Sequence, residues 1–103
     1  MRWIESIRLQ AAGARGRTVK GELAQLIRTV RQDRGWWGLV DVMLCSHASV
    51  PRLFAVALLW ETESPPREGS VLGQSLAQAL REFGMVDHVL WIAEESDHHP
   101  ATT

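Results

Sequence analysis

Residues 39–61, LVDVMLCSHASVPRLFAVALLWE, decide the fold of this chain. Two apolar runs flank a short polar segment, residues 46–52, and this pattern predicts a β-hairpin. We expect Cys45 to face Phe54 and Met43 to face Val56, and because side chains alternate along a strand the hairpin then has two distinct faces. One face carries Val40, Val42, Leu44, Leu53, Ala55, Ala57 and Leu59. The other carries Asp41, Met43, Cys45, His47, Phe54, Val56, Leu58 and Trp60. Both faces of the second arm are apolar, so both must be covered.

A strand and a helix precede the hairpin. Residues 3–10 alternate, with Trp3, Glu5, Ile7 and Leu9 on one face and Ile4, Ser6, Arg8 and Gln10 on the other. After a Gly- and Arg-rich connection, Thr18 has the side chain of a helix N-cap. Apolar residues then recur at helical spacing up to Val30, and Gly35 predicts a left-handed stop.

A second helix and a last strand follow the hairpin. Pro65 and Pro66 exclude regular structure from residues 62–69. Ser70 predicts an N-cap, and the helix that it begins is expected to end at Gly84. Residues 86–93 alternate as a strand, with His88 on one face and Trp91 on the other.

This order of elements, β-α-β-β-α-β, predicts an α+β, ferredoxin-like fold. Right-handed crossovers place both helices on the same face of a four-stranded antiparallel sheet. We expect one domain over residues 1–95 and a polar C-terminal tail over residues 96–103.

Two helices cover only one face of the sheet, and the face with the small residues Ala55 and Ala57 suits close helix packing. The opposite face, with Phe54, Val56, Leu58 and Trp60, is then left bare. Leaving these four side chains in water forfeits roughly 6–12 kcal/mol of favourable burial free energy, at about 1.5–3 kcal/mol for each side chain. We therefore expect a homodimer in which two sheets pack face to face.

Composition narrows the function classes. A net charge of −1 and a pI near 6.4 favour neither nucleic acid nor an anionic membrane as partner. The longest apolar run, residues 53–60, is far shorter than the roughly 20 residues that span a bilayer. The first ten residues do not resemble a signal peptide. Cys45 is the single cysteine, which favours a reducing cytoplasm and a buried, hydrophobic role.

The order, the length and the doubly apolar strand ending in Trp60 resemble the dimeric α/β-barrel proteins, and among them the antibiotic-biosynthesis-monooxygenase-like domains. The resemblance covers about residues 2–95. It implies a pocket between sheet and helices or inside the barrel. Members of that family oxidise aromatic polyketides or quinols without a cofactor, degrade haem, or have no known activity.

The resemblance makes Trp60 the first candidate for binding an aromatic substrate; the alternative is a core aromatic that anchors the dimer. Haem-degrading members pair such a Trp with an Asn and with a His on the second helix. This chain contains no Asn, and no His lies between Ser70 and Gly84. We therefore expect no haem and no other cofactor. The polyketide-oxidising members use Tyr, Asn, Trp and Arg, of which only Trp and Arg occur here.

Arg8 and Asp41 are charges in the middle of strands. If Arg8 shares the face of Asp41 and Trp60, the cleft holds an ion pair or an anion site, and a guanidinium beside aromatic rings suits a hydroxylated aromatic ligand. The alternative turns Glu5 inward instead, together with Trp3, Ile7 and Leu9. A purely structural pair of these charges at the sheet edge is a further possibility. Trp91 adds a second aromatic contact for the ligand.

His88 or Asp41 is the candidate proton acceptor, since an unperturbed imidazole titrates near neutrality. His47 is the other candidate imidazole; both histidines are expected at strand ends, where a solvated side chain is the alternative. Trp36 and Trp37 either form a lid over a pocket or seal the junction between helix and sheet.

Two further clusters suggest ligands only weakly. Asp97, His98 and His99 do not have the spacing of a closed metal site. The glycines and cations over residues 13–20 do not have the spacing of a phosphate-binding loop.

Two functions of different classes follow. The first is a small protein that binds or oxidises an aromatic ligand in the manner of the cofactor-independent monooxygenases. The alternative is a non-catalytic binding or scaffold protein, which the scarcity of polar residues on the inward face favours. A regulatory amino-acid-binding domain has the same topology but usually accompanies another domain.

Overall fold

A computed structural model describes residues 1–13, 18–33 and 35–94. The elements are strand β1 (Arg2–Ala11), helix α1 (Val19–Gln32), strands β2 (Leu39–Ser46) and β3 (Leu53–Glu61), helix α2 (Val71–Leu80) and strand β4 (Gly84–Ile92). The predicted β-α-β-β-α-β order and the α+β class are confirmed. The tail expected at residues 96–103, with its Asp97, His98 and His99, and the cations Arg15 and Arg17 lie outside the described residues.

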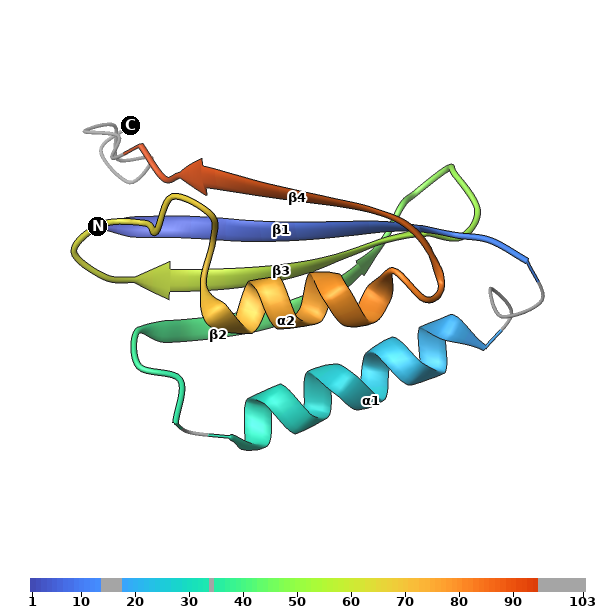
Figure 1. Cartoon of the computed structure of the whole chain (residues 1–103), viewed down its shortest axis with the longest axis horizontal. Coiled ribbons are helices and arrows are strands. Elements are labelled where there is room, and N and C mark those ends of the chain that lie inside the picture. The colour runs from blue at the N-terminus through green and yellow to red at the C-terminus, as the bar shows by residue number, and fades with distance from the viewer. Residues whose placement is uncertain (14–17, 34, 95–103) are drawn as a thin grey trace, which may run out of the picture.

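The strands form an antiparallel sheet in the order β2-β3-β1-β4. Figure 1 shows both helices on the same face of this sheet, where α1 packs beside β2 and α2 lies against β1 and β4. No helix of the described residues lies on the opposite face, which we call the open face. None of the helices in the described residues is long and apolar enough to cross a membrane.

The hairpin forms where the sequence predicts it, but its register differs by one residue. Cys45 pairs with Ala55 rather than Phe54, and Met43 pairs with Ala57 rather than Val56. Because side chains alternate, this shift exchanges the faces of the second arm. The expected bare face is wrong: the side chains of β3 that lie beneath the helices are Phe54, Val56, Leu58 and Trp60.

Side-chain size explains the exchange. The larger members of β3 bury most area against the helices, while the small Ala55 and Ala57 lie on the open face, half-buried by their neighbours. An irregularity between Leu39 and Asp41 adjusts β2 to this register, and Arg52 takes a left-handed conformation with φ 61° at the end of the turn. Cys45, predicted to be buried, lies exposed on the open face.

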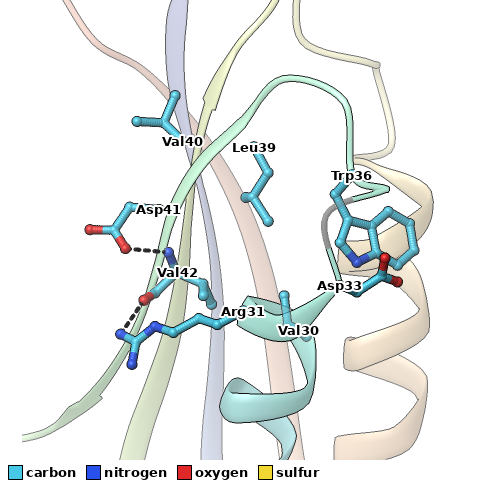
Figure 2. A pocket seen from close by; sticks show the side chains of 8 residues that line it. All are labelled: Val30, Arg31, Asp33, Trp36, Leu39, Val40, Asp41 and Val42. Atoms are coloured by element: carbon cyan, nitrogen blue, oxygen red, sulfur yellow. Dashed lines mark hydrogen bonds between the residues drawn. The ribbon is translucent and has the colours of Figure 1, made fainter.

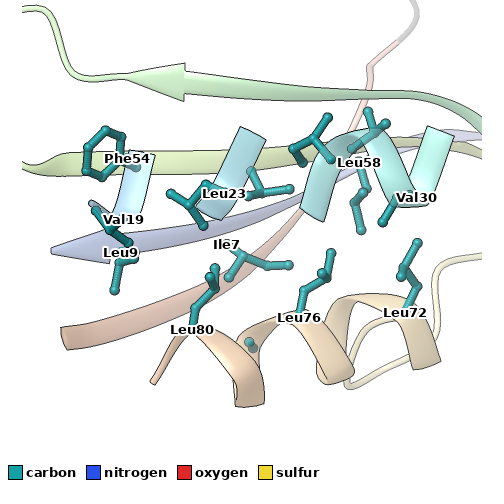
Figure 3. Close-up of a cluster of buried hydrophobic side chains, with 14 of the residues drawn as sticks. Ile7, Leu9, Val19, Leu23, Val30, Phe54, Leu58, Leu72, Leu76 and Leu80 are labelled. Atoms are coloured by element: carbon teal, nitrogen blue, oxygen red, sulfur yellow. The ribbon is translucent and has the colours of Figure 1, made fainter. Parts of the chain in front are cut away.

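The hydrophobic core fills the space between the sheet and the helices. Figure 3 shows Leu23 and Val30 of α1 meeting Leu72, Leu76 and Leu80 of α2 over the strands. Trp36 packs against the edge of this cluster, which is the junction role predicted for it. Trp37, by contrast, is exposed.

The ends of the helices follow the predictions in part. Ser70 is the N-cap of α2, and its Oγ accepts from the backbone N–H of Gly73 at 2.8 Å. The left-handed stop expected at Gly35 is wrong, since α1 ends at Gln32 and the Asp33 side chain accepts from the Gly35 N–H. Helix α2 ends at Leu80, and Gly84 instead begins β4, where a side chain would collide with the carbonyl of Gln10.

Candidate functional site

A buried carboxylate lies at the centre of the helix-covered face. Glu5 alternates with Trp3, Ile7 and Leu9 on β1, and its side chain is 0% exposed. A carboxylate removed from water is costly unless hydrogen bonds replace its solvation. The fold can therefore accommodate Glu5 at this position only if neighbouring groups donate hydrogen bonds to its carboxylate.

Four hydrogen bonds replace the lost water. Oε1 of Glu5 accepts from Trp60 Nε1 at 3.0 Å and from the Ser70 hydroxyl at 2.6 Å. Oε2 accepts from the Ser70 backbone N–H at 2.9 Å and lies 2.6 Å from Nε2 of His88. An ionised carboxylate has about four acceptor positions, so this set fills them.

Two glycines leave room for the carboxylate. A Cβ at Gly69 or Gly73 would collide with the Glu5 side chain, and Gly69 also needs its φ of +92°. Between them, Ser70 is the N-cap of α2, and its backbone N–H donates to Glu5. The positive end of the helix dipole then stabilises the negative charge.

Trp60 connects Glu5 to an aromatic pocket. Its ring stacks on Trp3 with centroids 5.6 Å apart, and Trp3 Nε1 donates to Thr62 at 2.8 Å. Beside this pair is a hollow of about 310 Å³, which we call the tryptophan pocket. It is lined by Trp3, Trp37, Trp60, Thr62, Ser64, Pro66, Ser70 and Val71.

His88 lies on the other side of Glu5. It occupies the middle of β4, opposite Ile7, and its side chain is 18% exposed, so the prediction of a solvated strand end is wrong. It lines a separate polar hollow of about 370 Å³, the His88 pocket. The other lining residues are Glu68, Gln74, Ala77, Gln78 and Arg81.

The predicted site residues divide between the two faces of the sheet. Trp60 and His88 lie under the helices, where both reach Glu5. Arg8 and Trp91 lie on the open face with Asp41. A cleft that brings Arg8 and Asp41 together with Trp60 is therefore wrong, and the alternative with Glu5 inward is the observed one.

Arg8 has a different partner from the expected one. Its guanidinium pairs with Asp87, its neighbour on β4, and both side chains are more than half exposed. Asp41 lies two strands away from β1, so the proposed Arg8–Asp41 pair does not form. Exposed pairs of this kind contribute little to stability.

Asp41 borders a third hollow, of about 320 Å³, between the end of α1 and edge strand β2. Figure 2 shows its carboxylate turned back to its own strand, where it accepts from the Val42 N–H at 2.8 Å. Arg31 reaches across from α1 to the Val42 carbonyl at 2.7 Å. These charges bond to the backbone of the edge strand, and so Asp41 is a weak candidate for proton transfer.

His47 is exposed in the hairpin turn. Its Nδ1 accepts from the backbone N–H groups of Ser49 and Val50, at 3.0 and 2.9 Å. The ring therefore shapes the turn, far along the chain from the Glu5 network.

The fold matches known structures, although no family model and no curated protein matches the sequence. A single-residue mutant of SnoaB, a cofactor-independent oxygenase from Streptomyces nogalater, superposes with a TM-score of 0.65 and 16% identity over 95% of this chain and 98% of that one. A Deinococcus radiodurans protein provisionally classed as an antibiotic biosynthesis monooxygenase gives 0.63 and 15%, over 94% and 97%. A second SnoaB structure gives 0.51 and 18%, over 95% and 96%.

This chain has their fold. The resemblance to monooxygenase-like ferredoxin-like proteins that the sequence suggests is thus confirmed for the architecture. In this fold, Glu5, which the sequence left as an alternative inward residue, is the centre of the candidate site. An acidic residue within an otherwise apolar alternating face was the signal for it.

Proposed function

We propose that this protein binds a small hydroxylated aromatic molecule in the tryptophan pocket and oxidises it without a cofactor. The observation that carries the proposal is a wall of three indole rings beside a buried, hydrogen-bonded carboxylate. Indole faces and edges suit a planar aromatic ligand. The volume, about 310 Å³, is near the lower end of the usual range for small-molecule sites. The oxygenase activity stated for SnoaB supports the reaction class.

Deprotonation is the step that protein groups would supply. A phenol or quinol that loses a proton becomes a better electron donor toward molecular oxygen. In this proposal the Glu5–His88 pair accepts the proton, and Trp60 holds the ring. For a quinol the balance closes without another reductant, because quinol and O2 give quinone and H2O2, with two electrons and two protons passing to oxygen.

Oxygen consumption tests the reaction. We expect 1,4-dihydroxynaphthalene to consume oxygen faster with the protein than with buffer alone, after treatment with a metal chelator. Trp37→Ala should lower this rate several-fold because Trp37 lines the pocket. Trp91→Ala, which removes an exposed indole on the open face, is the matched control and should leave the rate per folded chain unchanged. No acceleration by the wild-type protein would rule out the oxidation.

Non-catalytic binding is the second candidate. The observation that favours it is the complete set of donors around Glu5, which is also what a purely structural carboxylate needs. Binding of the naphthalene compound without accelerated oxygen consumption would select this function.

We also propose that a second copy of the chain covers the open face. Apolar side chains are exposed there, including Ile4 at 36%, Met43 at 49% and Trp91 at 59%. Together with the half-buried Leu59 they form a surface that association would remove from water. The exposed Cys45, the single cysteine, suits a reducing cytoplasm.

A further inference from the structure

We propose that Ser70 carries the proton of a ligand hydroxyl from the tryptophan pocket to Glu5, and so makes this pocket selective for hydroxylated aromatics. This inference rests on the proposed function. His88 lines the other pocket, whereas Ser70 and Trp60, which both bond to Glu5, line the tryptophan pocket.

Ser70 has the position that a relay needs. Its hydroxyl donates to Oε1 of Glu5 at 2.6 Å and accepts from the Gly73 N–H at 2.8 Å. A hydroxyl has one donor and two acceptor positions, so one acceptor position remains for a further partner. Because Ser70 also lines the tryptophan pocket, a ligand hydroxyl there is a suitable partner.

The proton transfer balances in two linked moves. The ligand O–H bond breaks and its proton passes to Oγ of Ser70, while the original Ser70 proton passes to Oε1 of Glu5. The ligand ends as a phenolate, Ser70 is unchanged, and Glu5 ends as a carboxylic acid. His88 keeps its contact with Oε2 throughout, so the imidazole positions the accepting carboxylate.

The titratable and charged groups around this carboxylate come from β4 and from the two segments that flank α2. His88 on β4 is in contact with Glu5, and Glu68 before α2 and Arg81 after it line the same pocket as His88. On the side of the tryptophan pocket, the lining groups are aromatic, hydroxyl-bearing or aliphatic. A negative charge that moves onto the ligand therefore stays near the N-terminus of α2, where the helix dipole favours it.

A matched pair of ligands tests the inference. 4-Nitrophenol and 4-nitrotoluene differ by a hydroxyl in place of a methyl group, and binding is followed through the tryptophan indole N–H signals by NMR. We expect the wild-type protein to bind the phenol about tenfold more tightly, the effect of one hydrogen bond to a well-placed acceptor. Ser70→Gly should abolish this preference, and glycine is well tolerated at an N-cap.

Ser64→Gly is the control variant. Ser64 lines the same pocket, but its contact with Thr62 is made by its backbone carbonyl, so the variant should keep the preference for the phenol. The colour of bound 4-nitrophenol reports proton transfer separately. At a pH where the free phenol is mostly neutral, we expect the phenolate absorption with wild-type protein and with Ser64→Gly, but not with Ser70→Gly.

The outcomes separate this inference from the proposed function. If Ser70→Gly keeps the preference, or if bound phenol stays neutral in the wild-type protein, the relay is wrong although the pocket binds aromatics. If neither ligand binds the wild-type protein, the tryptophan pocket is not an aromatic site and the proposed function fails with the relay.

Discussion

The two faces of the sheet differ in how their charged side chains are stabilised. On the helix-covered face the single buried charged residue among those described, Glu5, is surrounded by donors from β3, β4 and the start of α2. On the open face Arg8 and Asp87 form a cross-strand pair in which both side chains remain largely in solvent. A buried charge needs hydrogen-bond donors around it to replace its lost solvation. An exposed pair stays solvated, so the only protein contact that it needs is its paired neighbour.

The faces also differ in the size of their apolar side chains. Strand β3 places Phe54, Val56, Leu58 and Trp60 beneath the helices, whereas Leu53, Ala55, Ala57 and Leu59 lie on the open face. The adjacent Leu58 and Leu59 therefore lie in two different environments. We infer from this difference that packing against the helices favours burial of the row of β3 with the bulkier side chains. The smaller row remains for another surface.

The largest effect is expected from a carboxylate at Leu58. Its side chain is 0% exposed, and Leu58→Asp buries an unpaired charge, which should cost more than about 4 kcal/mol and leave the chain unfolded. Leu59→Asp, one residue later, should leave the fold intact but convert the expected dimer to a monomer. Circular dichroism and sedimentation measure the two results. A folded Leu58→Asp variant would contradict the assignment of faces.

Much of this fold was predictable because periodicity and capping act locally. The alternation of residues 3–10 and the N-cap at Ser70 depend on residues close in sequence. The register of the hairpin was not predictable in the same way. A shift of one residue leaves both arms apolar, and only packing of Phe54, Val56 and Trp60 against the helices decides between the two registers.

The candidate site was harder to predict for a related reason. Glu5 and His88 are 83 residues apart, and neither belongs to a short motif. An acidic residue on an apolar strand face can point into the core or mark the exposed face. The charge pattern of the strand favoured Arg8, rather than Glu5, for the inward position. The partners that make a buried Glu5 tolerable come from three other parts of the chain, so their convergence appears only in the folded protein.

Glycine substitutions sharpen the comparison on the covered face. A Cβ at Gly73 would displace the Glu5 carboxylate from its donors, so Gly73→Ala should destabilise the protein by about 3 kcal/mol. Gly21→Ala is the control, because nothing lies near the new methyl group on α1 and alanine favours a helix by roughly 0.5–1 kcal/mol. Thermal unfolding of both variants measures the contrast. Equal stabilisation by the two would mean that Glu5 does not occupy this position.

Neutralising the two kinds of charge should have unequal effects. In Glu5→Gln an amide N–H₂ replaces one acceptor oxygen and faces donors, which we expect to cost about 2 kcal/mol. Asp87→Asn removes an exposed pair and should change the free energy of unfolding by about 0.5 kcal/mol or less. Urea unfolding compares the two variants. A smaller loss for Glu5→Gln than for Asp87→Asn would show that the buried network contributes little.

The smallest effect is expected at Glu61, at the end of β3. Hydrogen bonds from the Met1 ammonium and then from the Arg2 guanidinium, each at 3.1 Å, lower the pKa of Glu61 from its ordinary value of 4.5. Because this carboxyl binds its proton less readily in the folded protein, its contacts add stability above about pH 4.5, and that stability is lost as the pH falls through the lower folded pKa.

Arg2→Gln should raise the pKa of Glu61, which an NMR titration of its carboxyl group measures. The carboxyl is solvent-exposed, so unfolding curves of wild-type and Glu61→Gln protein should differ slightly at neutral pH and coincide in acid. A large difference at neutral pH would show that a charge outside the helix-covered face can matter as much as Glu5.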